Sequence, residues 1–448
     1  MTRTPLDPGA ARRRYVVVSA LFWLPIGLSI APMVPLFSER GLSLAAIAGC
    51  VAAHSLTAAA LELPTGGLSD VLGRRAVLAA AGLFDVAALL LAALATTAWA
   101  LALGMALKGV GRALSSGPAE AWYVDTVHAS AGPDAELRTG LARGHAAEAV
   151  ALAVGVLVGG ALPWLSGLGP DLGDRLGDAT SGLVLPLSLP MLLGVAVEVG
   201  FVAYVLTALP EPPRPRATLS GVLRGVPGTV VSGLRLSAGD ALVRRVMLSA
   251  AAAGGALVTV ELLTPARAVD LTGAPESGAV LFAGLACAGY ACSAVGSQLA
   301  PRVARLAGDG ERAVLVSLGA AAGGLLLIGA TAALAGPYAL LPLAVGYVLI
   351  YVGLGAAAPS ENELLHRRVD SAGRATALSV QSLALQLVGA LTGLAAGNLP
   401  PGPPRWLLGG AVLLAGALLW ARRPPAARSR TLADGVTEPD RGSRKSVA

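Results

Sequence analysis

A short polar stretch between the second and third apolar runs has the most specific chemical pattern in this chain. It reads Gly-Gly-Leu-Ser-Asp-Val-Leu-Gly-Arg-Arg over residues 66–75. Glycines let a backbone bend tightly, and an acid followed by two arginines can form charge-assisted hydrogen bonds at the bend. The spacing predicts an ionic latch at a tight turn. The alternative is an ordinary basic loop that sets the orientation of the chain in a membrane.

Ionisable side chains inside long apolar runs are the second chemical feature. The acids are Asp85, Glu148, Glu198 and Glu261, and the basic groups are Lys108, Arg112 and His54. Such residues mark ion or substrate pathways, because a charge in lipid is costly unless it is paired or hydrated. We expect the acids to be candidates for proton coupling and the basic groups to charge a cavity. The alternatives are a static ion pair for Glu148, cations that reach the membrane surface, and a hydrogen-bonded core histidine.

Long apolar runs must position these residues. The chain has 448 residues, of which 55% are hydrophobic and 13% charged, and its mean hydropathy is +0.69. Apolar runs of about 20 residues can cross a membrane as helices, so the sequence predicts an all-α membrane protein. The twelve expected spans are about 15–37, 42–63, 76–96, 98–118, 140–164, 184–208, 246–267, 277–300, 312–334, 337–358, 374–396 and 405–422.

A proline- and arginine-rich segment divides the chain into two halves of six spans. The expected parts are an N-terminal segment 1–14, a bundle 15–208, a linker 209–245, a second bundle 246–422 and a disordered tail 423–448. The halves resemble repeats, because both the fourth and the tenth span end in a short Pro- and Glu-containing sequence. Two related six-helix halves are expected of transporters.

The distribution of charge predicts orientation. The net charge is +6, and the arginines between spans fall on one side of the twelve-span count. By the positive-inside rule that side is cytoplasmic, together with both termini and the linker. Because these residues do not gather on one soluble face, we expect no nucleic acid partner. Cys50, Cys287 and Cys292 lie in apolar runs without metal-ligand spacing, so we expect no disulfide and no metal site.

The latch stretch resembles the loop signature G-x-L-a-D-r-x-G-R-R-x-x-l between helices 2 and 3 of the major facilitator superfamily. The matching residues are Gly66, Leu68, Asp70, Gly73, Arg74, Arg75 and Leu78. The resemblance implies two six-helix pseudo-repeat halves and a cytoplasmic gate. The residues expected as gate partners are Glu62, Glu120, Asp125 and Arg112. The family's usual cavity-lining spans favour Glu148 and Glu261 over Asp85 and Glu198 as proton carriers.

Residues 155–160 in the fifth span, Gly-Val-Leu-Val-Gly-Gly, resemble the end of a fifth-helix motif associated with antiporters. Close helix packing is an equally good account of these small residues. The resemblance implies an inner-membrane, monomeric transporter that exports a small apolar compound and uses the proton gradient without a cofactor. Its partners would be the substrate, protons and the lipid bilayer. Proton-coupled uptake of a nutrient and a transport-inactive sensor or scaffold remain alternatives. With no nucleophile–base constellation, we expect no enzyme.

Topology gives a direct test of the span count. Reporter fusions at Arg216 and Gly442 should both behave as cytoplasmic, because an even number of spans puts the linker and the C-terminus on the basic side. A periplasmic signal at either position would contradict the twelve-span count.

Overall fold

The computed structural model describes residues 6–66, 68–166, 172–211, 238–334, 336–369 and 371–421, with eight further residues in 218–235. All regular structure in these residues is helical. Most of the expected linker and the tail 423–448 lie outside the described residues.

Six long helices form each half. The first half contains α1 (Pro8–Glu39), α2 (Leu44–Gly66), α4 (Arg74–Leu94), α5 (Ala98–Ser115), α7 (Arg138–Ser166) and α9 (Leu189–Ala208). The second half contains α11 (Ala241–Thr272), α12 (Pro275–Ala307), α13 (Gly310–Ala330), α14 (Leu340–Arg368), α15 (Ser371–Asn398) and α16 (Pro403–Leu418). Shorter elements are α3 (Leu68–Leu72), α6 (Pro118–Ala131), α8 (Leu172–Ala179), η1 (Pro186–Ser188) and η2 (Pro337–Ala339).

Ten of the described helices are long and apolar enough to cross a membrane. The other two long helices are α5, which carries two basic residues, and α16, which has 16 residues. All twelve lie where the sequence predicts spans. The chain is therefore an all-helical, multi-pass membrane protein.

Two helices begin earlier than their apolar runs. Helix α1 starts at Pro8 rather than near residue 15, and the Asp7 side chain accepts a hydrogen bond from the backbone N–H of Ala10. Helix α11 starts at Ala241 rather than at 246, where Asp240 accepts from two backbone N–H groups. Both acids are N-caps, which satisfy free backbone donors and extend a helix beyond its apolar residues. Hydropathy does not detect such polar first turns.

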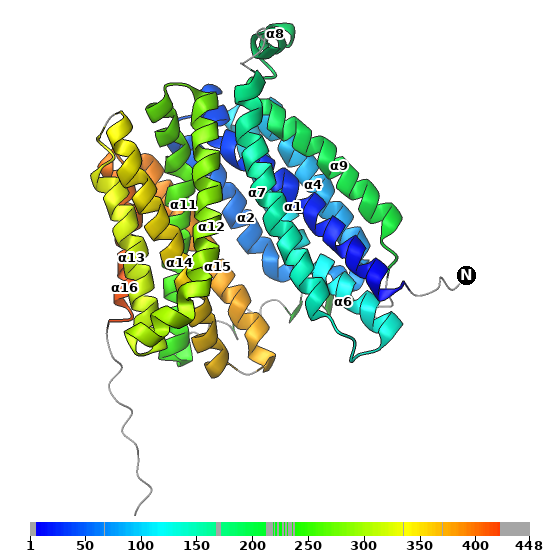
Figure 1. Ribbon diagram of the computed structural model, residues 1–448. Coiled ribbons are helices and arrows are strands. Elements are labelled where there is room, and N and C mark those ends of the chain that lie inside the picture. Colours follow the sequence, from blue (N-terminus) through cyan, green and yellow to red (C-terminus); the bar gives the residue numbers. More distant parts are fainter. Residues whose placement is uncertain are drawn as a thin grey trace, which may run out of the picture.

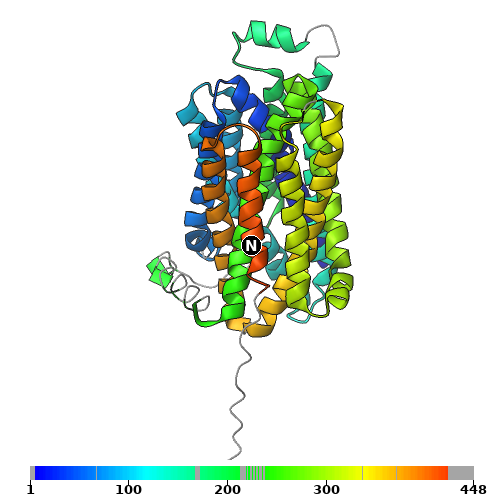
Figure 2. The ribbon, with the colours of Figure 1, turned by 90° about the vertical axis from the view of Figure 1, so that its left-hand side faces the viewer.

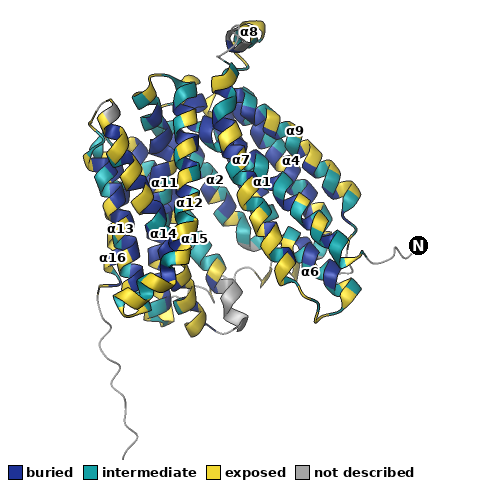
Figure 3. Ribbon diagram, viewed as in Figure 1, coloured by how far each residue is buried: buried dark blue, intermediate teal, exposed yellow. Residues whose placement is uncertain are grey.

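The two halves lie side by side (Figure 1). Helix α8 lies beyond one end of the long helices in both views (Figures 1 and 2), and we call this the α8 end. The opposite end, where α9 ends and α11 begins, is the linker end. Buried residues fill the inside of each bundle, whereas exposed residues cover the outer helix faces (Figure 3). An apolar outer face is expected where helices meet lipid.

The halves touch mainly through two antiparallel helix pairs, α2 with α15 and α7 with α12, and α1 also contacts α11 and α12. Small residues make these contacts close near the α8 end. A Cβ added to Gly160 would lie 2.5 Å from the Cβ of Ala283, and one added to Gly397 would lie 2.8 Å from that of Ala48. Toward the linker end, α7 and α12 lean apart (Figure 1). The halves are therefore packed most closely near the α8 end.

Helices α1 and α7 pack within the first half through reciprocal glycines. A Cβ on Gly27 would lie 2.5 Å from the Leu152 carbonyl oxygen, and one on Gly155 would lie 2.5 Å from that of Leu24. Small residues let membrane helices approach this closely. The glycines of residues 155–160 thus lie at close helix contacts.

This contact predicts that Gly155→Val lowers the Tm of the purified protein, because overpacking costs about 1–3 kcal/mol. The matched control is Gly200→Val, since a Cβ on Gly200 would meet no atom within 4 Å. Equal melting temperatures for the two variants in a thermal unfolding assay would contradict the close α1–α7 contact.

Candidate functional site

The latch stretch forms a tight turn between α3 and α4 at the linker end. Gly73 precedes α4 with a φ of 101°, a backbone conformation that favours glycine. Arg74 donates hydrogen bonds to Asp125 of α6 at 3.1 Å and to Ser69 of α3 at 2.6 Å. The Arg74–Asp125 ion pair is partly buried, so it is less screened by solvent than a surface pair. The turn is thereby tied to α6.

Glu211, just after α9, binds the start of α4. Its carboxylate accepts hydrogen bonds from the backbone N–H groups of Arg74 at 2.8 Å and of Arg75 at 3.2 Å. The N-terminus of a helix has free N–H donors and a positive dipole end, so an acid is favourable there. Sequence reasoning missed Glu211. The only signal was an acid among prolines immediately after the sixth span.

The expected gate partners have separate positions. Asp125 contacts Arg74, whereas Glu62 accepts hydrogen bonds from Ser382 and Gln386 of α15, each at 3.0 Å. Glu62 thus joins the two halves rather than the latch turn. Glu120 lies on α6 and lines a pocket described below. The side chain of Asp70 lies outside the described residues.

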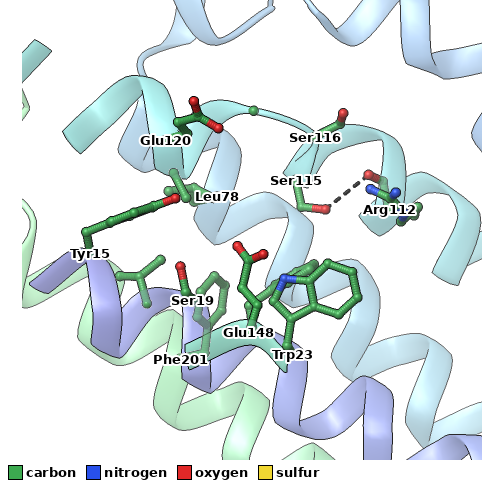
Figure 4. Close-up of a pocket in the computed structure, with 14 residues that line it drawn as sticks. Tyr15, Ser19, Trp23, Leu78, Arg112, Ser115, Ser116, Glu120, Glu148 and Phe201 are labelled. Carbon is green, nitrogen blue, oxygen red and sulfur yellow. Dashed lines mark hydrogen bonds between the residues drawn. The ribbon is translucent and has the colours of Figure 1, made fainter. Parts of the chain in front are cut away.

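A pocket of about 170 Å³ lies inside the first half and contains Glu148, Glu120 and Arg112 (Figure 4). Its aromatic wall includes Tyr15 and Trp23. For Glu148 the sequence leaves two roles open, proton coupling and a static ion pair. Its carboxylate lies 3.2 Å from Nδ1 of His145 on its own helix, within hydrogen-bond distance. Arg112 also lines this pocket. Lys108 lies one turn earlier on α5 and lines the central cavity described next.

A central cavity of about 230 Å³ lies between the halves. Helices α1, α2 and α5 line it from the first half, and α11 and α12 line it from the second. Its ionisable groups are Lys108, His54 and Glu261, and its remaining lining is apolar except for Ser29. Lys108 Nζ donates to Ser29 Oγ at 2.7 Å. Glu261 is exposed although it lies well inside α11, so its carboxyl reaches the open space between the halves.

Asp85 and Glu198 lie behind Lys108, away from the central cavity. They are 7% and 1% exposed, and with Lys108 they line a second cavity of about 10 Å³. Glycines make room for both carboxyl groups. A Cβ on Gly111 would lie 2.5 Å from Asp85 Oδ1, and one on Gly82 would lie 3.0 Å from Glu198 Oε1. The structure therefore gathers Asp85, Glu198 and Lys108 from three helices.

Three tyrosines form a cluster in the second half that sequence reasoning also missed. The ring centroids of Tyr347 and Tyr351 lie 4.9 Å apart, and those of Tyr290 and Tyr351 lie 6.4 Å apart. Tyr290 comes from α12 and the other two come from α14, four residues apart on one helical face. Only that spacing in the tenth span could have indicated the cluster.

The latch contacts predict how readily trypsin cuts after Arg74 or Arg75. Glu211→Gln and Asp125→Asn should each raise this cleavage about fivefold, because losing about 1 kcal/mol increases the opened population by that factor. Mass spectrometry of the fragments gives the rate at this site. Glu120→Gln is the control, since Glu120 does not contact the turn. Unchanged cleavage in both test variants would show that these contacts do not hold the turn.

Several solved transporter structures have a fold similar to this one. The nucleoside transporter NupG has the same fold over 92% of this chain and 98% of its own, with 13% identity and a TM-score of 0.70. A bacterial homologue of the lysosomal transporter Spinster, in an inward-facing state, matches over 94% and 96% with 16% identity and a TM-score of 0.66. The peptide transporter POT matches over 93% and 97% with 15% identity and a TM-score of 0.61.

These identities show a shared fold and no more. No curated protein sequence matches the chain. The sequence pattern of one family, however, matches residues 15–393, which include the latch stretch and both halves of the bundle. The chain belongs to the Major Facilitator Superfamily.

Proposed function

We propose that this protein is a secondary active transporter that exports a small apolar compound in exchange for protons. The observation that carries the proposal is the central cavity, because both halves line it and its walls are mostly apolar. A ligand between two halves is the arrangement that alternating access requires. The resemblance of residues 155–160 to an antiporter motif favours export.

We place the protein in the cell membrane with both termini and the linker end in the cytoplasm. This orientation follows from the arginines near that end. The close contacts near the α8 end then close the cavity toward the outside. The Arg74–Asp125 pair and the Glu211 cap lie at the cytoplasmic end, where a gate must form and break. We propose a monomer that uses the proton gradient and needs no cofactor.

A second candidate is proton-coupled uptake of a charged nutrient. The observation that favours it is the pair of opposite charges in the cavity, Lys108 from the first half and Glu261 from the second. A buried cation and a buried acid can bind a polar solute through its charges, whereas an apolar solute would leave both groups without a partner. Transport direction and substrate polarity separate the two candidates.

Transport in inside-out membrane vesicles tests the proposal. A panel of fluorescent apolar dyes should include compounds that accumulate in energised vesicles and leave when a protonophore collapses the gradient. Lys108→Met should reduce accumulation at least about tenfold, because it removes the charge-assisted hydrogen bond between Lys108 and Ser29 that holds the cavity wall, and such bonds contribute roughly 1.5–3 kcal/mol.

The control variant is Glu363→Gln, since Glu363 is exposed and pairs with Arg367 on the outside of α14. It should transport at the native rate. Dye movement without a proton gradient would contradict proton coupling, and gradient-driven uptake of amino acids or nucleosides into whole cells would favour the second candidate.

A further inference from the structure

The second cavity, which lies behind Lys108 and which we call the chamber, has an unusual charge balance. Asp85 comes from α4, Glu198 from α9 and Lys108 from α5, and the two acids are 7% and 1% exposed. Two carboxylates and one ammonium carry a net charge of −1. A buried net charge is costly in an apolar surrounding, whereas one bound proton makes the three groups neutral.

Among the described residues, Asp85, Glu198 and Lys108 are the charged groups that line this chamber. Arg112 of α5 lies one turn beyond Lys108, is exposed and lines the pocket that contains Glu148, so its charge acts on Asp85 less than that of Lys108. From α1, Pro25 and Ile26 close the chamber with apolar atoms. His54 of α2 and Glu261 of α11 lie on the far side of Lys108, in the central cavity. Glu261 also attracts Lys108. Less of the positive charge of Lys108 then balances Asp85 and Glu198, which favours a bound proton on these two carboxyl groups.

The geometry suits a shared proton. Oε1 of Glu198 is buried and has no hydrogen-bond partner among the described residues. The chamber of about 10 Å³ is close to the least space that holds one water molecule. One water in this chamber would then join Glu198 to Asp85, and such charge-assisted bonds are strong. Two coupled carboxyl groups take up protons as a unit.

We propose that Asp85 and Glu198 share one proton behind Lys108 and that this pair stores the proton exchanged for substrate. The inference rests on the proposed transport function. When the proton leaves to water in the central cavity, the second carboxylate forms and attracts the Lys108 ammonium away from Ser29 and Glu261. When a proton returns to one carboxylate oxygen, Lys108 is released to the cavity. Each protonation state thereby favours a different cavity charge, which coupling requires.

Infrared spectroscopy tests the proposal without any substrate. The full-length protein is purified at pH 7.5 in a detergent without ester or carboxyl groups, and the carbonyl stretch of protonated carboxyl groups is measured. Asp85→Asn and Glu198→Gln should each remove one carboxyl equivalent from this band, because the remaining acid then pairs with Lys108 alone. The double variant should remove no more than either single variant. Lys108→Met should add one equivalent, since both acids must then be neutral.

Glu363→Gln is the control for the same chemical change at an exposed acid and should leave the band unchanged. Each single variant tests the idea independently, so a variant that fails to fold leaves the other informative. An unchanged band in a folded single variant would overturn the proposal. Losses that add in the double variant would also overturn it, because two separate protons would then be present. If the band behaves as expected while the inside-out membrane vesicles transport nothing, the proposed function fails and the shared proton stands.

Discussion

The cost of placing Lys108 inside an apolar bundle is the constraint on which the site depends. An ammonium in such a surrounding needs hydrogen bonds and counter-charges. Ser29 supplies a hydrogen bond at 2.7 Å, and acids on three other helices surround it. Asp85 and Glu198 lie on the side of the first half, and Glu261 lies on the side of the second. Lys108 therefore connects the interior of one bundle with the space between the two.

Glycine makes this arrangement possible. Gly111 and Gly82 leave room for the carboxyl groups of Asp85 and Glu198, and a methyl group at Gly111 would lie 2.5 Å from Asp85 Oδ1. The same principle applies to the helix contacts, where glycines on α1, α7 and α15 bring backbones together. Because lipid gives no hydrophobic drive for helices to associate, close contact between small residues contributes much of the stability of such bundles. The close packing of the helices and the burial of the two carboxyl groups thus both depend on glycine.

The latch turn connects the linker with the first half. Glu211 caps α4, and Trp122 of α6 donates to the Pro210 carbonyl oxygen at 2.7 Å. Arg14 also donates to the Ala208 carbonyl oxygen. The segment that leaves the first bundle is therefore fixed to α1, α4 and α6. A movement of the linker would act directly on the turn between α3 and α4.

The sequence by itself determined the helical class, the positions of the twelve long helices and the latch turn, because apolar run length and the glycine–arginine pattern are local properties. Local patterns do not report how each helix is rotated or which helix lies beside it. Only the tertiary structure showed that Glu148 lies within hydrogen-bond distance of His145, that Glu62 contacts α15 and that Glu211 caps α4. It also brought Asp85 of α4 and Glu198 of α9 to Lys108 of α5. That meeting depends on close packing across glycines, which spacing along one helix does not encode.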